Sequence, residues 1–359
     1  MDILSVELGS RSYPILIGAG LLAREDGAVA AQVAARDVLL VTNTTVAALH
    51  APALRAALPG RRIVEVVLPD GEVHKTLANV ARILDVLVAN RFGRDACVVA
   101  LGGGVVGDMA GFAAACYQRG VAFVQVPTTL LAQVDSSVGG KTGVNHPGGK
   151  NLIGAFHQPA AVIADTATLD TLPDRELRAG IAEVVKYGLI CDRPFFEWLE
   201  AHIDALLARD PAALAGAIRR SCELKARIVA RDEHEHGERA WLNFGHTFGH
   251  AIESATGYAG WLHGEAVGAG MLVAADMSRA CGALAAADVE RIERLLRRVG
   301  LPLDVSAITG TAALALMRMD KKVQAGRIRL VLLNRIGEAC VTSDYPDDAL
   351  AATLAAHFG

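Results

Sequence analysis

The chain has 359 residues, about twice the usual length of a single domain, and this length predicts two domains. Hydrophobic residues make up 52% of the sequence and charged residues 21%, a balance that excludes a disordered or low-complexity chain. Lys and Arg number 35 against 39 Asp and Glu, and the resulting net charge of −4 excludes an overall positive field that would attract nucleic acid or anionic lipid.

The first half of the chain alternates short β-branched runs with helical patterns. Apolar residues at positions 77, 80, 83, 84 and 87 share one face of a predicted helix over residues 77–90. Nearly continuous apolar strands separated by helices predict an α/β domain with a mainly parallel, Rossmann-like sheet covered on both faces. The expected strands are residues 14–17, 37–42, 62–68, 97–101, 123–126 and 162–164.

Beyond residue 172 the pattern becomes mainly helical. Pro173 and Pro211 stand where the first turn of a helix tolerates proline, and Gly257, Gly282 and Gly300 stand where helices end. We therefore predict an α/β domain over residues 1–172 and a mainly helical domain over residues 173–359. The expected helices are residues 175–190, 195–208, 211–232, 243–256, 265–281, 289–299 and 312–319, followed by a hairpin of strands 327–333 and 338–342.

The sequence indicates neither export nor a membrane span. The first seven residues include early acids and no basic or long apolar region, unlike a signal peptide. Residues 96–116 are apolar, but three adjacent glycines and Asp108 argue against a continuous membrane helix. Six scattered cysteines without a C-x-x-C motif are typical of reduced thiols. We expect a cytoplasmic protein with no membrane or nucleic-acid partner.

A glycine-rich turn follows the expected strand 97–101. Residues 102–107 match G-x-G-x-x-G, the pattern with which a strand-to-helix turn lets a dinucleotide's pyrophosphate approach the backbone. A purely structural turn explains the glycines equally well. The acid expected about 20 residues further on is absent, and the next one is Asp135, so any bound ribose is held in another way.

Two histidines of the predicted helix 243–256 are spaced for metal binding. His246 and His250 lie four residues apart and so share one helix face, a common arrangement for zinc. His263 before the next helix adds a third imidazole, and Glu183 on an earlier helix adds a carboxylate three residues before Lys186. One carboxylate and two imidazoles with an open position would suit a catalytic zinc. A helix that carries two histidines by chance is the alternative.

A glycine-rich segment with two lysines occupies residues 135–151. Walker A spacing is absent, because Asp135 stands where the first glycine would be. Backbone amides and the ammonium groups of Lys141 and Lys150 could still hold phosphate or carboxylate groups. The acidic run of residues 232–238 is expected to be a solvated loop.

Taken in order, these motifs resemble the 3-dehydroquinate synthase family. No single motif decides the matter, but the ordered set is highly specific and extends from about residue 70 to the Asp320-Lys321-Lys322 segment. The motifs are D-G-E-x-x-K-T at 70–76, the glycine turn ending at Asp108, P-T-T-L-L-A-Q-V-D-S-S-V-G-G-K-T-G-V-N at 127–145, G-K-N-L-I-G-A-F at 149–156, E-x-x-K-Y at 183–187 and N-x-G-H-T-x-G-H at 243–250.

The resemblance implies a dehydroquinate synthase-like fold and the second step of the shikimate pathway. The substrate would be 3-deoxy-D-arabino-heptulosonate 7-phosphate, and the products 3-dehydroquinate and inorganic phosphate. The family uses NAD⁺ catalytically together with zinc or cobalt. It oxidises the C5 hydroxyl, which acidifies the C6 proton and permits elimination of phosphate, and it then returns the hydride and closes a carbocycle by an aldol step.

The resemblance also implies roles for particular residues. The metal ligands would be Glu183, His246 and His263, with His250 transferring a proton at the C5 oxygen. Arg119 would reach the substrate phosphate of the neighbouring subunit in a homodimer. The substrate's anionic groups would meet Lys141, Lys186, Lys225, Arg239, Lys321 or Lys322, Asn151 and Asn243. The NAD site would be lined by Asp70, Gly71, Glu72, Val73, His74, Lys75, Gly104, Val105, Val106, Gly107, Asp108, Thr128, Thr129, Asp135, Lys141, Lys150, Thr168, Leu169, Asp170 and Thr171.

Four alternatives stay open at this point. Another sugar phosphate cyclase, making a valiolone or a deoxy-inosose, would need no carboxylate pocket, so Lys225 and Arg239 weigh against it. An aminated variant of the same substrate is harder to exclude. A metal-dependent polyol dehydrogenase would share the architecture but give net redox. A nucleotide-binding regulatory module would leave the Glu and His set without a purpose.

Overall fold

In the computed structural model, residues 1–24, 26–257, 260–319, 323–324 and 327–359 are described. Contacts divide the chain into two compact units, one of Met1–Pro173 with Leu214–Ala230 and one of Asp174–Ala213 with Arg231–Gly359. The division into domains 1–172 and 173–359 remains a prediction, and the contact-based units differ from it by placing most of helix α7 (Pro211–Arg231) with the first unit.

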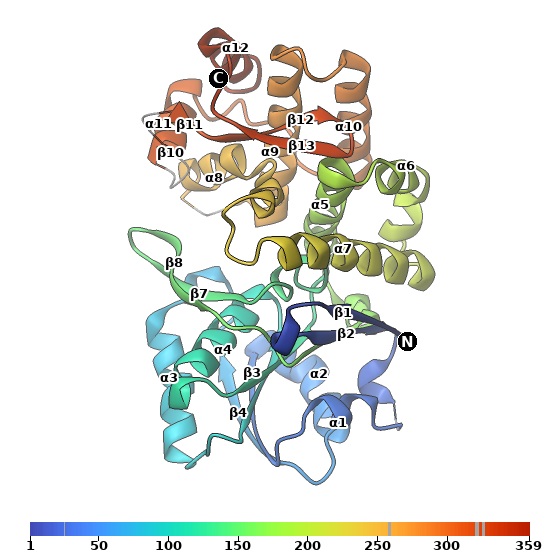
Figure 1. Ribbon diagram of the computed structural model, residues 1–359, viewed down its shortest axis with the longest axis vertical. Helices are drawn as coiled ribbons and strands as arrows, with labels where there is room; N and C mark the ends of the chain where they lie inside the picture. Colours follow the sequence, from blue (N-terminus) through green and yellow to red (C-terminus); the bar gives the residue numbers. More distant parts are fainter. Residues whose placement is uncertain (25, 258–259, 320–322, 325–326) are drawn as a thin grey trace. The chain divides into compact units, whose positions relative to one another are not determined.

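A seven-stranded sheet forms the centre of the first unit (Figure 1). Its order is β1-β2-β9-β6-β5-β3-β4, and every neighbouring pair is parallel except β1 with β2. The expected mainly parallel, Rossmann-like sheet is confirmed, with β1 added at one edge. The strands are β1 (Asp2–Val6), β2 (Tyr13–Gly18), β3 (Asp37–Asn43), β4 (Arg62–Leu68), β5 (Cys97–Gly102), β6 (Ala122–Pro127) and β9 (Ala161–Asp165).

Both faces of this sheet are covered by helices. Along β3, Leu39 and Val41 pack into one core with α3 and α4, whereas Val38 and Leu40 pack into the other core with α1 and α2. Successive side chains of a strand point to opposite faces, so a doubly covered strand is apolar throughout. Figure 1 shows α3 and α4 on one side of the sheet and α1 and α2 on the other. These helices are α1 (Ala28–Gln32), α2 (Thr44–Ala56), α3 (Leu77–Ala89) and α4 (Gly104–Cys116).

The strand order creates a switch point at the carboxyl ends of β3 and β5. From β3 the chain passes to β4 on one side and then crosses to β5 on the other, and ligands of such sheets bind outside the strand ends at this point. Shorter elements surround these ends. They are the turns η3 (Glu72–His74) and η6 (Thr166–Thr171), the short π-helical element η5 (Ala132–Ser136), and the hairpin of β7 (Lys141–His146) and β8 (Gly149–Phe156). The turn η4 (Tyr117–Arg119) lies at the opposite edge of the sheet, because it precedes the amino end of β6. The turns η1 (Gly9–Arg11) and η2 (Leu21–Ala23) lie elsewhere in the first unit.

The second unit is mainly helical, as the sequence predicts. Its hairpin of β12 and β13 packs against α9 and α5, and the elements β10 and β11 form a short pair. Its elements are α5 (Asp174–Cys191), α6 (Arg193–Leu207), η7 (Glu238–Asn243), α8 (His246–Ala255), α9 (His263–Ala280), α10 (Ala286–Val299), α11 (Gly310–Met319), β10 (Val323–Gln324), β11 (Arg327–Ile328), β12 (Leu330–Arg335), β13 (Glu338–Thr342) and α12 (Asp347–His357).

Several helix starts differ from the sequence-based expectation by one to three residues, and two of these starts position residues of the candidate site. Helix α8 begins at His246 rather than at 243, because Gly245 takes a left-handed φ of 79° and separates α8 from the turn η7. Helix α9 begins at His263 rather than at 265, and the carboxylate of Glu265 accepts the backbone N–H of Leu262 at 2.7 Å, which satisfies a donor just before the first turn.

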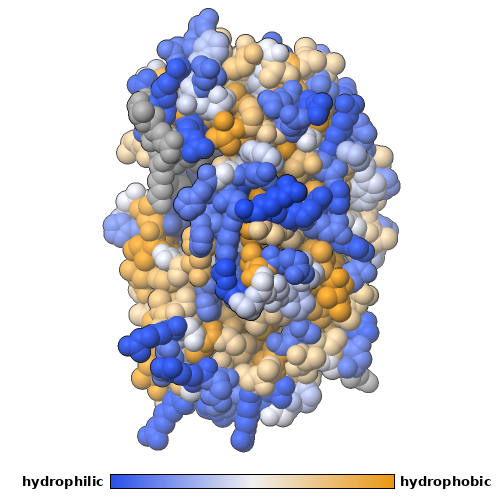
Figure 2. Space-filling view, in the orientation of Figure 1, coloured by the Kyte–Doolittle hydropathy of each residue, from blue (hydrophilic) through white to orange (hydrophobic). Residues whose placement is uncertain are grey.

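Figure 2 shows hydrophilic side chains dispersed among apolar ones on the face that it draws. Among the described residues, no helix combines the length and the apolar character that a membrane crossing requires.

Candidate functional site

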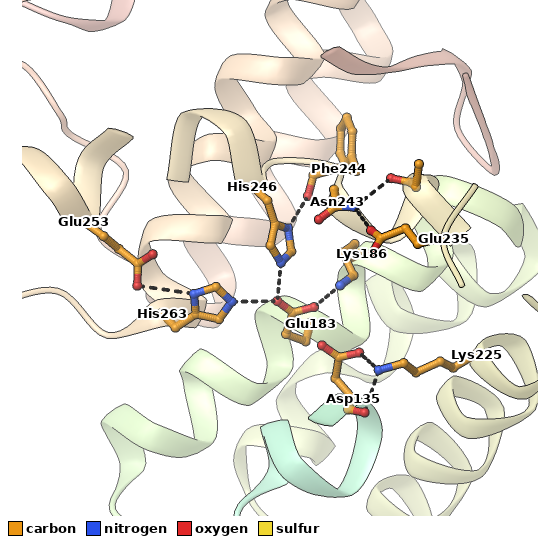
Figure 3. A network of polar contacts seen from close by, with 11 residues as sticks. Asp135, Glu183, Lys186, Lys225, Glu235, Asn243, Phe244, His246, Glu253 and His263 are labelled. Atoms are coloured by element: carbon orange, nitrogen blue, oxygen red, sulfur yellow. Dashed lines mark hydrogen bonds and ion pairs between the residues drawn. The ribbon is translucent and has the colours of Figure 1, made fainter. Parts of the chain in front are cut away.

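Three side chains of the second unit bring metal-ligating atoms together (Figure 3). Glu183 comes from α5, His246 from the first residue of α8 and His263 from the first residue of α9. The Nε2 atoms of the two imidazoles lie 3.7 and 3.8 Å from Oε1 of Glu183, and all three ligand atoms lie within 4.8 Å of one another. The structure thus brings together the three residues that the sequence singles out as metal ligands.

Glycines allow the three helix backbones to approach closely enough for this convergence. A Cβ on Gly264 would lie 2.0 Å from the carbonyl oxygen of Ala179 on α5. Between α8 and α9, a Cβ on Gly245 would lie 2.8 Å from the carbonyl oxygen of Val267, and a Cβ on Gly249 would lie 3.0 Å from that of Ala266. Real Cβ atoms essentially never approach as closely as at Gly264 and Gly245, and the approach at Gly249 is tighter than most, so glycine permits the backbones to touch here. The glycines next to His246, His250 and His263 therefore have a packing role.

The chemistry of the ligand atoms suits a divalent metal ion. Glu183 is fully buried, and neither of its carboxylate oxygens accepts a hydrogen bond from the described residues, although Lys186 forms an ion pair with Oε2. A buried carboxylate needs a cation or strong donors to compensate its charge. One carboxylate oxygen and two imidazole nitrogens form a donor set that zinc and cobalt accept, and three protein ligands leave a position open.

The orientation of each imidazole is fixed by the partner of its other nitrogen. The Nδ1 atom of His246 lies 3.2 Å from the carbonyl oxygen of Phe244, and the Nδ1 atom of His263 lies 3.3 Å from Oε1 of Glu253. Such acceptors hold the proton on Nδ1 and leave Nε2 with a lone pair directed at the metal position. Sequence reasoning missed Glu253, although its spacing of seven residues from His246 places both on one face of α8.

His250 lies beside the ligand cluster. Its ring centroid is 5.6 Å from that of His246 and 6.2 Å from that of His263. In the described part of the chain, the group whose ligand atoms converge contains Glu183, His246 and His263 but not His250. This separation is compatible with the proton-transfer role that the sequence suggests for His250, and that role stays a prediction.

The acidic run 232–238 is a solvent-accessible loop, as expected from its charges, and hydrogen bonds to Asp232 order it. The carboxylate of Asp232 accepts the backbone N–H groups of His236 at 2.9 Å, Gly237 at 2.7 Å and Arg239 at 3.0 Å. Burial raises the pKa of Asp232, but the donated N–H groups outweigh burial and lower the pKa below its usual range. Apart from the acid at the start of the run, no local pattern predicts these three hydrogen bonds.

This loop also holds two of the predicted substrate-binding residues. The guanidinium of Arg239 is buried and donates to the carbonyl oxygen of Glu233. The amide of Asn243 donates to Oε1 of Glu235 at 2.5 Å (Figure 3). Arg239 and Asn243 therefore both belong to the turn η7, and each is hydrogen-bonded to an acidic residue of the preceding loop.

In the first unit, the loops at the carboxyl ends of β3 and β4 are tied together. The carboxylate of Asp70 accepts the side-chain N–H of Asn43 at 2.8 Å and the hydroxyl of Thr45 at 2.7 Å. Glu72 accepts the amide of Asn145 at 2.8 Å, which connects the turn η3 to β7. Both acids, which the sequence assigns to the NAD site, thus lie at the switch point of the sheet.

Lys75 contacts two other predicted site residues in the first unit. Its Nζ atom lies 2.5 Å from Oδ2 of Asp108 and donates to Oδ1 of Asn151 at 2.6 Å. Burial opposes the charged form of Lys75, but the carboxylates of Asp108 and Glu72 outweigh burial and raise its pKa. A charged ammonium therefore stands between the first turns of α4 and the hairpin.

Close packing explains two glycines of the glycine-rich turn, which could also bind a ligand. A Cβ on Gly104 would lie 2.8 Å from the hydroxyl of Ser136, and a Cβ on Gly107 would lie 2.7 Å from the side-chain oxygen of Gln125. The turn opens α4 directly at the end of β5, and the N–H groups of a first helical turn have no acceptor within the helix. The residues present fit a pyrophosphate at this end.

The other predicted residues of the first unit fall into separate groups. Lys225 of α7 forms an ion pair with Asp135 of η5 (Figure 3), and Thr168 accepts a hydrogen bond from Gln133 at 3.2 Å. Thr128 and Thr129 follow β6, Lys141 begins β7 and is exposed, Lys150 lies in β8, and Thr168, Leu169, Asp170 and Thr171 lie in η6. Gly71 precedes η3, Val73 and His74 lie within it, and Val105 and Val106 belong to the first turn of α4.

Arg119 and the pair Lys321 and Lys322 are the remaining predicted site residues. Arg119 ends the turn η4, is exposed and has a left-handed φ of 66°. Lys321 and Lys322 lie outside the described residues, so their predicted role stays a prediction.

Comparison with known proteins gives matches over the whole chain. Models described as 3-dehydroquinate synthase N-terminal and 3-dehydroquinate synthase C-terminal match residues 65–179 and 180–323. A protein of Azotobacter vinelandii named 3-dehydroquinate synthase is 60% identical over 99% of this chain and 96% of its own length. One of Pseudomonas aeruginosa with the same name is 58% identical over 99% of this chain and 96% of its own length.

Two solved synthase structures share the fold. The 2-epi-5-epi-valiolone synthase of Streptomyces hygroscopicus, solved with NAD⁺ and Zn²⁺ bound, has a TM-score of 0.88 and 30% identity over 99% of this chain and 98% of its own. A 2-deoxy-scyllo-inosose synthase, solved with carbaglucose-6-phosphate, NAD⁺ and Co²⁺, has a TM-score of 0.88 and 25% identity over 99% of this chain and 100% of its own.

Proposed function

The chain belongs to the 3-dehydroquinate synthase family, and from this premise we propose that it converts 3-deoxy-D-arabino-heptulosonate 7-phosphate into 3-dehydroquinate and inorganic phosphate. The observation that carries the proposal is the convergence of Glu183, His246 and His263 beside the buried cation of Lys186. A fixed metal position next to a charge-compensating lysine suits an alcohol that must lose a proton and then a hydride.

We assign the metal position to zinc or cobalt and the switch point of the sheet to NAD⁺. A bound metal ion would polarise the C4 and C5 oxygens of the substrate. NAD⁺ would supply a hydride acceptor that is restored within the cycle. The solved cyclases with a nicotinamide cofactor and a divalent metal support both assignments.

The chain's own residues bind, orient and move protons. His250, beside the ligand cluster, exchanges the proton of the C5 hydroxyl. Lys186 neutralises Glu183 and so keeps the cluster from carrying excess negative charge. In the second unit Arg239 and Asn243 bind anionic and hydroxyl groups of the substrate, and in the first unit Lys141, Asn151 and Lys225 do so.

A carboxylate in the substrate separates this activity from that of its nearest rivals. The proposed substrate carries a phosphate and a carboxylate, and two anionic groups need several cations at one ligand. We assign Arg239 and Lys225, which are both buried, as cations that bind these anionic groups. A cyclase acting on a sugar phosphate without a carboxylate would not require both.

We further propose that the enzyme is a cytoplasmic homodimer in which Arg119 reaches the partner's substrate. Six cysteines remain free thiols, which is consistent with a reducing compartment. Arg119 is exposed on a strained left-handed backbone, and such strain is retained where a side chain must be presented in a particular direction.

The test is the release of inorganic phosphate from the heptulosonate phosphate by the purified protein, with the organic product identified by NMR. The proposal predicts one dehydroquinate for each phosphate, with activity lost on chelation and restored by zinc or cobalt. Phosphate release that yields no carbocycle, or turnover that survives complete removal of metal, would contradict it.

A further inference from the structure

Glu253 is a buried acid for which the proposed reaction has no use. It lies in the last turns of α8 and is 2% exposed. A carboxylate near the carboxyl end of a helix faces the negative end of the helix dipole, and burial removes the water that would otherwise stabilise its charge. Both effects are unfavourable, so the position calls for a compensating contact.

The compensating contact joins α8 to the first residue of α9. Oε1 of Glu253 lies 3.3 Å from Nδ1 of His263, while Nε2 of the same ring lies 3.8 Å from Oε1 of Glu183 (Figure 3). The imidazole thus stands between two carboxylates, one on each nitrogen. An ionised carboxylate can only accept, so the Nδ1 atom must carry the proton that is shared with Glu253.

We infer that Glu253 is a positioning residue that sets the tautomer and the ring orientation of His263, so that Nε2 is the nitrogen presented to the metal. His263 needs this support more than His246 does, because its side chain is 34% exposed against 11% for His246. The inference rests on the proposed metal site.

The same helix face carries the whole arrangement. His246, His250 and Glu253 are spaced at i, i+4 and i+7, which places them in one row along α8. The row supplies a ligand, a proton-transfer group and a support for the ligand on α9. A carboxylate that accepts a hydrogen bond from Nδ1 also makes the imidazole more basic, and therefore a stronger metal ligand.

The backbone at His263 is fixed independently of Glu253. Glu265 accepts the N–H of Leu262, and Arg175 binds both carboxylate oxygens of Glu265 at 2.7 Å. Because this clamp holds the start of α9, loss of Glu253 should release the ring of His263 without releasing the helix. The variant is therefore expected to fold.

The experiment measures zinc affinity of the full-length protein by competition with a chromophoric chelator, without substrate or NAD⁺. Glu253→Met should bind zinc about 10- to 100-fold more weakly than the unaltered protein, the range seen when such supporting partners are lost. Glu253→Gln, whose neutral side-chain oxygen can still accept from Nδ1, should fall between the two. The visible spectrum of the cobalt-loaded protein should change in the same order.

Asp276 provides a matched control, because it forms the other carboxylate–histidine contact of α9, with His357 at 2.8 Å. It lies about 20 Å along the helix from His263, at 1.5 Å per residue. Asp276→Asn should leave zinc affinity unchanged.

Zinc affinity equal to that of the unaltered protein in folded Glu253→Met would overturn the inference, and so would a Gln variant that binds no better than the Met variant. Should the Met variant fail to fold, the tautomer of His263 in the unaltered protein provides the test. In its metal-free form, two-bond ¹H–¹⁵N spectra should show His263 protonated on Nδ1, and protonation on Nε2 would overturn the inference. Because these readouts need no turnover, they can fail while the proposed reaction holds.

Discussion

A single methyl group at Gly264 should separate two of the helices that carry the metal ligands. Gly264 follows His263 on α9, and a Cβ there would lie 2.0 Å from the carbonyl oxygen of Ala179 and 2.6 Å from its carbonyl carbon. Ordinary carbon contacts need about 3.5 Å, so Gly264→Ala requires a displacement of roughly 1 Å or more. Overpacking of this kind costs about 1–3 kcal/mol.

The displacement falls directly on the ligand geometry. Ala179 precedes Glu183 by one turn of α5, and Gly264 is adjacent to His263. Metal–ligand distances tolerate only about 0.2 Å, so a shift of about 1 Å between α5 and α9 should separate the ligands. We expect a lower melting temperature and a loss of zinc affinity of at least about 100-fold, more than for a supporting partner alone.

The assay compares zinc affinity and thermal unfolding of Gly264→Ala with those of Gly216→Ala. Gly216 lies within α7, and a Cβ there would meet nothing within 4 Å. The control should gain about 1 kcal/mol from helix propensity and retain its metal. Zinc affinity in Gly264→Ala equal to that of the control would refute the argument that this close helix contact sets the site.

Four further outcomes are expected. His246→Ala should lose both the metal and turnover, whereas His250→Ala should keep the metal and react about 10²–10⁴-fold more slowly. Elemental analysis measures the metal content, and equal loss of metal in both variants would make His250 a ligand. NAD⁺ should be required but not consumed, and absorbance at 340 nm rising in step with phosphate would instead indicate net oxidation. Folding lowers the pKa of Asp232 from 3.8, so its contribution to the free energy of unfolding should be complete above pH 3.8 and lost as the pH falls through the folded pKa. Near neutral pH, Asp232→Asn should lower the free energy of unfolding by about 1 kcal/mol. Denaturant curves that show the same difference between the two proteins at low pH would refute the assignment. Mixing inactive Arg119→Ala with inactive His246→Ala chains should restore about one quarter of the sites if Arg119 acts across a two-fold dimer, and no recovery despite proven subunit exchange would retire that role.

The sheet of the first unit could be predicted because its physical signal is local. Each of its expected strands is a run of apolar, mostly β-branched residues, and Val38 to Val41 show why, since they alternate between two buried cores. The hairpin of β7 and β8 was harder to foresee. Its glycines read as a loop, yet a Cβ on Gly154 would lie 2.0 Å from the carbonyl oxygen of Thr142, so these glycines allow two strands to pair closely.

Most of α7 packs with the first unit, which no pattern within the helix reveals. Its connection to that unit comes from tertiary contacts, in which Cys222 donates to the carbonyl oxygen of Gln133 at 3.2 Å and Lys225 pairs with Asp135. Hydrophobic periodicity identifies a helix and its buried face. It does not say which neighbour covers that face.

In the site, the sequence identified residues whose chemistry is visible from type and spacing, but not those that act through other residues. Glu253 and Asp232 read as ordinary surface acids in a helix and a loop. Their roles follow from contacts with Nδ1 of His263 and with three backbone N–H groups. Such contacts depend on the arrangement of helices in space, which spacing along the chain does not encode.

The most direct test of the central claim is a comparison of kcat/KM, by phosphate release, for 3-deoxy-D-arabino-heptulosonate 7-phosphate and for sugar phosphates that lack the carboxylate. The account predicts turnover of the heptulosonate phosphate, with the others slower by at least about 10³-fold, since they cannot form the carboxylate contacts assigned to Arg239 and Lys225. A comparable or greater rate with glucose 6-phosphate or sedoheptulose 7-phosphate would contradict it.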